Sequence, residues 1–293
     1  MTAPERLHDL LRTARAAVQA ASELLAGARP GEIRSKGTAR DLVTEWDLRA
    51  EETVRRVLLE RERGIPILGE EGGLGHPASE ASAGAERPQW TPDRSGLRWI
   101  VDPIDGTVNF AHGLPIWSVA LGLEDGADLL VGVVAAPALG WWFEAVRGGG
   151  ARGALDGSGV RGGELAPLRV SAISRLDQAM LATGFPYDMA TNPDNNLAEW
   201  DHLYRRAGTC RRLGCASLDL CMVGCGWFDG YWERQLSAWD LAAGALVVRE
   251  AGGTVTDTRG GTFDPHTGEV VATNGAIHEE LIAELGRVRR PAS

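Results

Sequence analysis

The spacing of apolar residues predicts two amphipathic helices near the start of the chain. From Leu7 to Leu25, apolar side chains recur every three or four positions, so they share one face of a helix expected over residues 4–27. Pro30-Gly31 follows, and such a pair ends a helix. A second helix is expected from Thr44 or Glu45 to Arg63. Both helices therefore present an apolar face to the interior of a fold.

Shorter apolar runs, typical of β-strands, follow these helices. In the first half of the chain they occupy residues 65–68, 98–101, 117–123, 129–136 and 141–146. In the second half, expected strands at 180–183, 227–233, 254–257 and 270–273 alternate with expected helices at 215–223, 241–250 and 277–288. The glycine-rich segments 72–96 and 147–166 are expected loops, and the first is a candidate lid or a plain insertion.

These elements favour an α+β fold with helices and sheets in separate layers, an α-β-α-β-α sandwich. A length of 293 residues suits one large domain or two tightly joined ones, and 44% hydrophobic residues can fill a sizeable core. We expect a single domain over residues 1–293, with an N-terminal α+β half over about 1–146 and a C-terminal α/β half over about 167–293.

The net charge of −10 argues against general nucleic-acid binding, which needs a basic surface. An acidic protein also repels a phosphate ester unless bound cations reverse the local field. The sequence holds no run of 18 apolar residues, so we expect no membrane span. Its N-terminus begins an amphipathic helix rather than a signal-peptide core, and we expect a cytoplasmic protein.

Cysteine and nucleotide-binding motifs offer no alternative chemistry. The four cysteines lie between Cys210 and Cys225 without the Cys-x₂-Cys spacing of a zinc site, and we expect buried thiols. Gly148-Gly-Gly-Ala-Arg-Gly153 matches a dinucleotide fingerprint, but no expected helix follows it, so a hairpin turn is predicted there. Lys36 is the only lysine and follows Ser35, which excludes a P-loop.

The segment from Trp99 to Phe110 combines features of a metal site and of a phosphate site. Asp102 and Asp105 follow an apolar strand, and carboxylate oxygens are the ligands that hard cations such as Mg²⁺ prefer. Gly106-Thr107 comes next, and the backbone N–H groups of such a turn can bind a phosphate, especially where a helix begins. The alternative is an ordinary polar turn at the end of a strand.

Two further segments carry carboxylates at the ends of predicted elements. Glu70 and Glu71 follow an apolar run, and Asp240 stands at the start of an apolar helix. Taken separately, paired glutamates usually face solvent, and an aspartate at a helix start usually caps it. Together with Asp102 and Asp105, these residues predict an oxygen-ligand cluster of the kind that a two-metal site needs.

Four segments of the chain resemble the inositol monophosphatase family. They are Leu-Gly-Glu-Glu71, Asp102-Pro-Ile-Asp-Gly-Thr107, Trp239-Asp-Leu-Ala-Ala-Gly244 and the N-terminal Asp41-Leu-Val-Thr-Glu-Trp-Asp47, preceded by Lys36. They follow the family's order, and the resemblance extends over roughly residues 5–287. It implies an α-β-α-β-α sandwich, dependence on two or three Mg²⁺ ions with Mn²⁺ as an alternative, inhibition by lithium and a homodimer.

The resemblance also implies a set of metal ligands. Glu70, Asp102 and the backbone carbonyl of Ile104 would hold a first metal ion. Asp102, Asp105 and Asp240 would hold a second, and Glu70 would help to place a third. Asp105 and Asp240 would also face the substrate. Two such cations can make a nucleophile from water and stabilise the leaving oxygen of a phosphate monoester.

The remaining catalytic roles are implied in the same way. Gly106 and Thr107 would bind the phosphate through their backbone N–H groups, and Thr107, oriented by Asp47, would activate the attacking water together with Glu70. Lys36 is either a surface charge or a nearby cation that tunes the site.

For the substrate, the resemblance places Gly184, Ala216 and Glu233 in a pocket for a small phosphorylated polyol or amino alcohol. A carboxylate at Glu233 can accept hydrogen bonds from ring hydroxyls, which suits inositol 1-phosphate, or from the ammonium group of histidinol phosphate. Fructose 1,6-bisphosphate and nucleotide phosphates are further alternatives. The resemblance to inositol-type members favours inositol 1-phosphate.

A function of another class is a regulatory binding protein that keeps the fold. Some bacterial relatives in the family are associated with the transcription machinery, and the acidic charge disfavours RNA contact but not a protein partner. The full set of acidic residues favours catalysis, because a pure binding protein need not retain every metal ligand.

Overall fold

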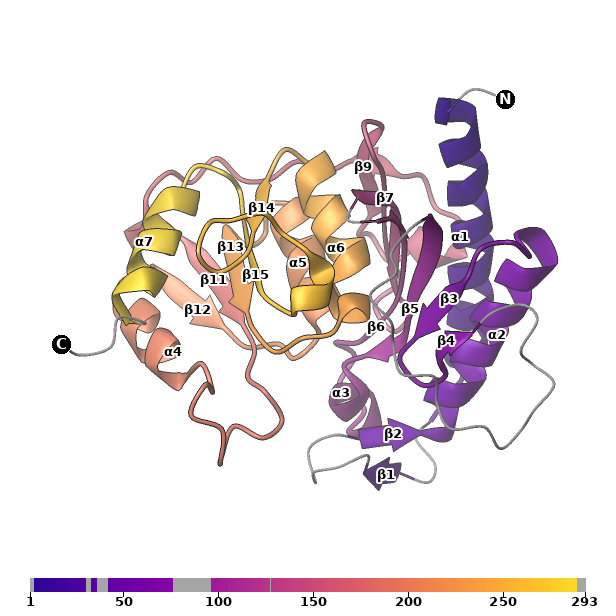
Figure 1. Ribbon diagram of the computed structural model, residues 1–293, viewed down its shortest axis with the longest axis horizontal. Coiled ribbons are helices and arrows are strands. Elements are labelled where there is room, and N and C mark those ends of the chain that lie inside the picture. The colour runs from indigo at the N-terminus through magenta and orange to yellow at the C-terminus, as the bar shows by residue number, and fades with distance from the viewer. Residues whose placement is uncertain (1–2, 30–32, 36–41, 76–95, 127, 289–293) are drawn as a thin grey trace.

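The computed structural model describes residues 3–29, 33–35, 42–75, 96–126 and 128–288. Their helices and strands form five layers in the order α-β-α-β-α (Figure 1). Most of the expected loop 72–96, together with Lys36 and Asp41, lies outside the described residues. Among the helices that are described, none has the length and apolar character needed to cross a membrane.

Two N-terminal helices form the first layer. α1 (Ala3–Leu25) and α2 (Glu45–Arg61) pack against one another and against the first large sheet (Figure 1). A capping box starts α2: the Thr44 side chain accepts a hydrogen bond from the Trp46 N–H at 3.1 Å, and the Asp47 carboxylate accepts one from the Thr44 N–H at 2.8 Å. The start of the helix therefore fixes the position of Asp47. A small antiparallel ribbon, β1 (Ile33–Ser35) and β2 (Leu42–Thr44), lies beside it.

The second layer is a sheet whose strands, within the described residues, follow the order β10-β9-β8-β7-β6-β5-β3-β4. Its strands are β3 (Ile67–Gly69), β4 (Gly73–Gly75), β5 (Leu97–Asp105), β6 (Ser118–Asp125), β7 (Asp128–Ala136), β8 (Trp141–Val146), β9 (Gly150–Ala154) and β10 (Ala166–Pro167). The short helix α3 (Thr107–Ala111) follows β5. β5 and β6 are buried along most of their length, because helices cover both faces of the sheet.

The middle layer consists of α5 (Ala216–Gly224) and α6 (Ala238–Glu250), between the two sheets (Figure 1). Every residue of α5 is buried, as expected for a helix that is apolar on all sides. α6 lies very close to the first sheet at Gly132, where a Cβ atom would stand 2.6 Å from the Ala243 carbonyl oxygen. This close approach brings the first turn of α6 to the end of β5, where the acidic residues lie.

The second large sheet has the order β12-β11-β13-β15-β14. Its strands are β11 (Met180–Thr183), β12 (Thr209–Arg211), β13 (Gly230–Glu233), β14 (Thr254–Thr256) and β15 (Val270–Thr273). α4 (Leu197–Tyr204) and α7 (His278–Val288) cover its outer face and form the fifth layer (Figure 1). Short 3₁₀ turns occupy Gly159–Arg161, Leu176–Gln178 and Pro265–Thr267.

The layered sandwich predicted from the sequence is confirmed, but the loop expected over 147–166 is wrong in part. Residues 147–149 do form the predicted hairpin turn, and Gly150–Ala154 then pairs with β8 as β9. This strand has no alternation of large apolar residues, because Gly153 lies against Trp142, where a Cβ atom would stand 2.8 Å from the Trp142 carbonyl oxygen.

One smaller expectation is also wrong, because the strand expected over 227–233 begins only at Gly230. Of the four cysteines expected as buried thiols, Cys210, Cys215 and Cys221 are buried, whereas Cys225, which follows the end of α5, is partly exposed. α3, α4 and β12 are short elements that the apolar pattern did not predict.

Candidate active site

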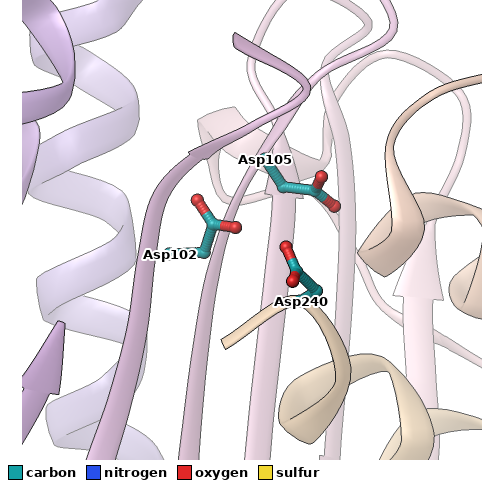
Figure 2. A group of neighbouring side chains, drawn as sticks. All are labelled: Asp102, Asp105 and Asp240. Carbon is teal, nitrogen blue, oxygen red and sulfur yellow. The ribbon is translucent and has the colours of Figure 1, made fainter. Parts of the chain in front are cut away.

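An irregularity in β5 turns Asp102 and Asp105 toward the same space. Residues three positions apart on a regular strand point to opposite faces. Here Asp102 is opposite Ala120 and Asp105 is opposite Ser118, so three steps along β5 match two along β6. The additional residue is a bulge, which redirects the strand and brings both carboxylates to one side (Figure 2).

Asp240 completes this group from the other half of the chain. It lies in the first turn of α6, where its Oδ2 accepts a hydrogen bond from the Ser237 N–H at 2.6 Å. Oxygen atoms of Asp102, Asp105 and Asp240 all lie within 4.8 Å of one another (Figure 2). Asp240 therefore both caps its helix and faces the cluster. Its capping role, expected as the alternative, is compatible with metal binding.

The electrostatics of this cluster fit a divalent cation. Burial raises the pKa of Asp102 well above its usual range, and the nearby carboxylates, Glu70 first, raise it further. Burial likewise raises the pKa values of Asp105 and Asp240. In the part of the chain that the structure describes, Oδ1 of Asp102 is buried without a hydrogen-bond partner. Buried, mutually repelling carboxylates are stable as anions only when a cation binds between them.

Asp105 is anchored by the N-terminus of α5. Its Oδ2 accepts hydrogen bonds from the N–H and the hydroxyl of Ser217, both at 2.6 Å, and from the Cys215 thiol at 3.2 Å. The Ser217 hydroxyl in turn lies 2.6 Å from that of Ser118 on β6. Sequence reasoning missed Ser217 and Cys215, although both flank Ala216 in the segment assigned to the substrate pocket.

Thr107 and Asp47 are in contact, as the resemblance implied. The Thr107 hydroxyl lies 3.1 Å from Oδ1 of Asp47 and 3.0 Å from the backbone carbonyl oxygen of Ile104. Oδ2 of Asp47 accepts the hydroxyl proton of Thr44 at 2.6 Å. Since Asp47 is held from both sides, the Thr107 oxygen is fixed close to the turn at Gly106. Gly106 has φ +89°, and a Cβ there would stand 3.0 Å from the Ile116 carbonyl oxygen.

The two adjacent glutamates face different surroundings. Glu70 lines a cavity of about 330 Å³ together with Asp105 and Asp240. Glu71 instead lines a surface hollow beside α2, with its own N–H bonded to the Glu51 carboxylate. Of the pair, Glu70 is therefore the one placed to ligate a metal.

The same cavity reaches the expected substrate residues Gly184, Ala216 and Glu233. Glu233 is buried and accepts a hydrogen bond from the Tyr231 hydroxyl. Burial raises the pKa of Glu233 to about 7, while Tyr231 and then Arg212 act in the opposite direction. Gly184 is required by contact, because a Cβ atom there would stand 2.2 Å from the Glu233 oxygens.

Sequence reasoning did not find three further residues that line this cavity. Tyr187 comes from the loop after β11, Arg212 precedes α5 and Trp239 lies in the first turn of α6. Trp239 begins one of the segments that carry the resemblance, next to Asp240, and Tyr187 is three residues from Gly184, so proximity in the sequence was the available signal.

We compared the chain with known protein families and proteins of similar sequence. The model of the inositol monophosphatase family matches residues 6–290. The inositol-1-monophosphatase of Synechocystis is 39% identical over 255 residues, which cover 87% of this chain and 80% of the relative. The Nus factor SuhB of Pseudomonas aeruginosa is 38% identical over 249 residues, covering 84% of this chain and 83% of the relative.

A solved structure agrees with these sequence matches. The inositol monophosphatase of Anabaena superposes with a TM-score of 0.80 at 34% identity, over 96% of this chain and 97% of that chain. The chain therefore belongs to the inositol monophosphatase family and is a phosphoric monoester hydrolase.

Proposed function

We propose that this protein hydrolyses inositol 1-phosphate to inositol and phosphate with Mg²⁺ as its cofactor. The observation that supports the proposal most strongly is the buried carboxylate cluster of Asp102, Asp105 and Asp240. Asp105 and Asp240 of this cluster line one cavity together with Glu70 and Glu233. Oxygen-only ligands favour Mg²⁺, and Mn²⁺ is the alternative. The relative from Synechocystis carries the name of this activity.

The family resemblance implies the ligands of the metal ions, and the cluster of Asp102, Asp105 and Asp240 supports this set. Glu70, Asp102 and the carbonyl of Ile104 would hold one ion, and Asp102, Asp105 and Asp240 a second, with Glu70 also near a third. When bound, these ions lower the pKa of a water molecule and neutralise charge on the phosphate. Asp102 would be the ligand that both ions share, and its buried and unpartnered Oδ1 supports this role.

The chain's own groups would position and deprotonate the attacking water. The Thr107 hydroxyl donates its proton to Asp47 or to the Ile104 carbonyl, so a lone pair on its oxygen remains to accept a hydrogen bond from water. The Glu70 carboxylate is the second acceptor and would take the proton. Gly106 and Thr107 begin α3, and N–H groups of a first helical turn lack intrahelical partners and can bind phosphate.

The shape and polarity of the cavity favour a small polyol ester. A volume of about 330 Å³ is small for a ligand pocket and suits a single ring with one phosphate group. Glu233, whose carboxylate occupies the room left by Gly184, would accept hydrogen bonds from ring hydroxyls in the part of the cavity lined by Ala216. Histidinol phosphate is the alternative, because an ammonium group would pair with an ionised Glu233.

We further propose that the protein forms a homodimer and that lithium inhibits its activity, as the resemblance implies. The Pseudomonas relative is named a Nus factor, which keeps a regulatory role as a second candidate. Hydrolysis is the stronger proposal, because the complete set of ligands supports catalysis directly.

Phosphate release from a panel of esters tests the proposal. The panel contains inositol 1-phosphate, histidinol phosphate, fructose 1,6-bisphosphate and adenosine 3′,5′-bisphosphate, each with Mg²⁺ and with a chelator. We expect turnover that needs Mg²⁺ and is fastest with inositol 1-phosphate. A higher kcat/KM for histidinol phosphate would make that ester, rather than inositol 1-phosphate, the proposed substrate. A folded, Mg²⁺-loaded protein that is inactive on every ester would overturn the proposal.

A further inference from the structure

We propose that Glu51 of α2 is a positioning residue for the metal site, because its carboxylate holds the tight turn from which Glu70 projects. The inference deepens the proposed function and rests on it, since Glu70 is taken as a metal ligand. Glu51 itself lines a surface hollow beside α2, whereas Glu70 lines the active-site cavity. Glu51 therefore acts through the backbone of the turn.

The turn is the short connection between β3 and β4. Gly69 pairs with Gly73, so Glu70, Glu71 and Gly72 form the whole hairpin loop. The Glu70 N–H bonds to the Val101 carbonyl on β5 at 3.2 Å, which ties the first residue of the loop to the central sheet.

The next two N–H groups of the loop both bond to Glu51. The Glu71 N–H donates to Oε2 at 2.8 Å, and the Gly72 N–H donates to Oε1 at 2.9 Å. Two adjacent backbone donors bound to the two oxygens of one carboxylate fix both the position and the rotation of the peptide units. The direction of the Glu70 side chain follows from these peptide units, because it leaves the backbone one residue earlier.

Arg55, one turn further along α2, completes the clamp. Its Nε donates to Oε1 of Glu51 at 2.8 Å, and one terminal nitrogen donates to the Gly73 carbonyl at 2.8 Å. The guanidinium thus balances the charge of Glu51, which is only 2% exposed. The same side chain holds the end of the loop, so α2 contacts the loop along its length.

Two glycines, Gly69 at the end of β3 and Gly72 in the loop, leave room for this carboxylate. A Cβ atom on Gly69 would stand 2.5 Å from the Glu51 carboxyl group, and one on Gly72 would stand 2.7 Å from Oε1. Neither glycine has a positive φ, so their small size, rather than their backbone conformation, allows Glu51 to approach. The pattern Gly-Glu-Glu-Gly therefore serves two functions. Glu70 faces the cavity as a proposed metal ligand, and the two glycines leave room for the Glu51 carboxylate.

The test combines Mg²⁺ titration calorimetry with hydrogen exchange on the full chain and its E51Q variant. Glutamine keeps the size of the side chain but turns one acceptor oxygen into a donor group, which opposes one of the three donors. We expect a Kd for Mg²⁺ about tenfold higher, the lower end of what loss of an outer-shell partner causes. The peptide spanning 70–73 should exchange at least tenfold faster in the absence of metal. Turnover should recover at high Mg²⁺ concentration.

Matched controls separate positioning from general destabilisation. E52Q changes the neighbouring carboxylate, which is exposed on the same helix, and should leave both measurements unchanged. If E51Q does not fold, G72A tests the same contact from the loop side, and G64A is its control, because a Cβ at Gly64 meets nothing within 4 Å.

The outcomes distinguish this inference from the proposed function. A wild-type chain that binds Mg²⁺, together with E51Q or G72A variants that match their controls in Mg²⁺ affinity and exchange, would overturn the role of Glu51 alone. A wild-type chain that binds no Mg²⁺ would overturn the proposed function and this inference with it.

Discussion

At the scale of single residues, the position of Asp102 lowers the stability of the folded chain. It is buried, repelled by neighbouring carboxylates and has an oxygen without a hydrogen-bond partner among the described residues. Such a group costs the folded chain free energy unless a cation binds it. An unfavourable residue at the centre of a site indicates a function for the site rather than for the fold.

We therefore predict opposite effects of D102N on activity and on metal-free stability. Turnover should fall by about 10³-fold or more, since metal ions contribute several kcal/mol to transition-state stabilisation. The free energy of unfolding in chelator should rise by about 1–2 kcal/mol, because a neutral amide removes like-charge repulsion. Urea unfolding and phosphate release check both effects, with D125N as an exposed control. An active D102N enzyme would contradict the assignment of Asp102 as the shared ligand.

Glu233 gives a prediction in pH. Its pKa is about 7 in the folded chain, chiefly because of burial, and is about 4.3 for an unperturbed glutamate. Between these pH values the folded state binds the additional proton, so stability falls as pH rises, and the loss is complete above about pH 7. The full difference corresponds to about 4 kcal/mol, of which about 3 kcal/mol is lost between pH 4.5 and pH 8. Between pH 4.5 and pH 8, we expect the free energy of unfolding of the wild type to fall by about 3 kcal/mol more than that of E233Q. Urea unfolding in chelator measures both values. If the free energy of unfolding of the two proteins changes equally with pH, the prediction is wrong.

At the scale of elements, the site depends on how β5 meets α5 and α6. Asp105 at the end of β5 is held by the first turn of α5, through the Ser217 N–H and hydroxyl. Asp240 belongs to the first turn of α6. Negative groups near helix N-termini are stabilised there, which partly offsets the crowding of carboxylates.

We predict that S217A loosens Asp105 without dismantling the fold. The variant removes a hydroxyl that bonds to Asp105 and to Ser118, at a cost of about 1–3 kcal/mol in stability. Loss of such an outer partner should reduce kcat/KM by about tenfold or more. Steady-state kinetics and thermal unfolding test this, with S22A as a control for losing a buried hydroxyl far from the site. Unchanged kinetics in S217A would mean that the Ser217 N–H and the Cys215 thiol orient Asp105 without the hydroxyl.

The same scale explains what the sequence could and could not predict. Helices α1 and α6 and strands β6 and β7 have long, regular apolar patterns, so their existence was predictable. β9 was not, because glycine and alanine replace large residues where the strand lies against Trp142. The bulge between Asp102 and Asp105 was also hidden, since it depends on pairing with β6. The role of Glu51 depends on a contact 20 residues away in the chain, which no local pattern contains.

At the scale of the whole molecule, we propose that both halves fold as one domain. One hydrophobic cluster joins Ile100 and Phe143 of the first sheet with Leu246 of α6 and Val270 of the second sheet. A buried polar contact supports this, because His266 of the C-terminal half lies 2.9 Å from the Glu124 carboxylate on β6.

The cluster itself joins these halves, since Asp102 and Asp105 come from β5 and Asp240 from α6. A cation that binds all three adds a link between distant segments and binds only the folded chain. At a Mg²⁺ concentration about 100 times Kd, one site stabilises the protein by about 2.7 kcal/mol. For a chain of 293 residues, we expect an increase in Tm of about 4 °C over the chelator-treated protein. The rise should appear in a single calorimetric transition and be absent from D102N. Two transitions, with only one shifted by Mg²⁺, would instead mean that the halves unfold separately and that one half alone holds the metal.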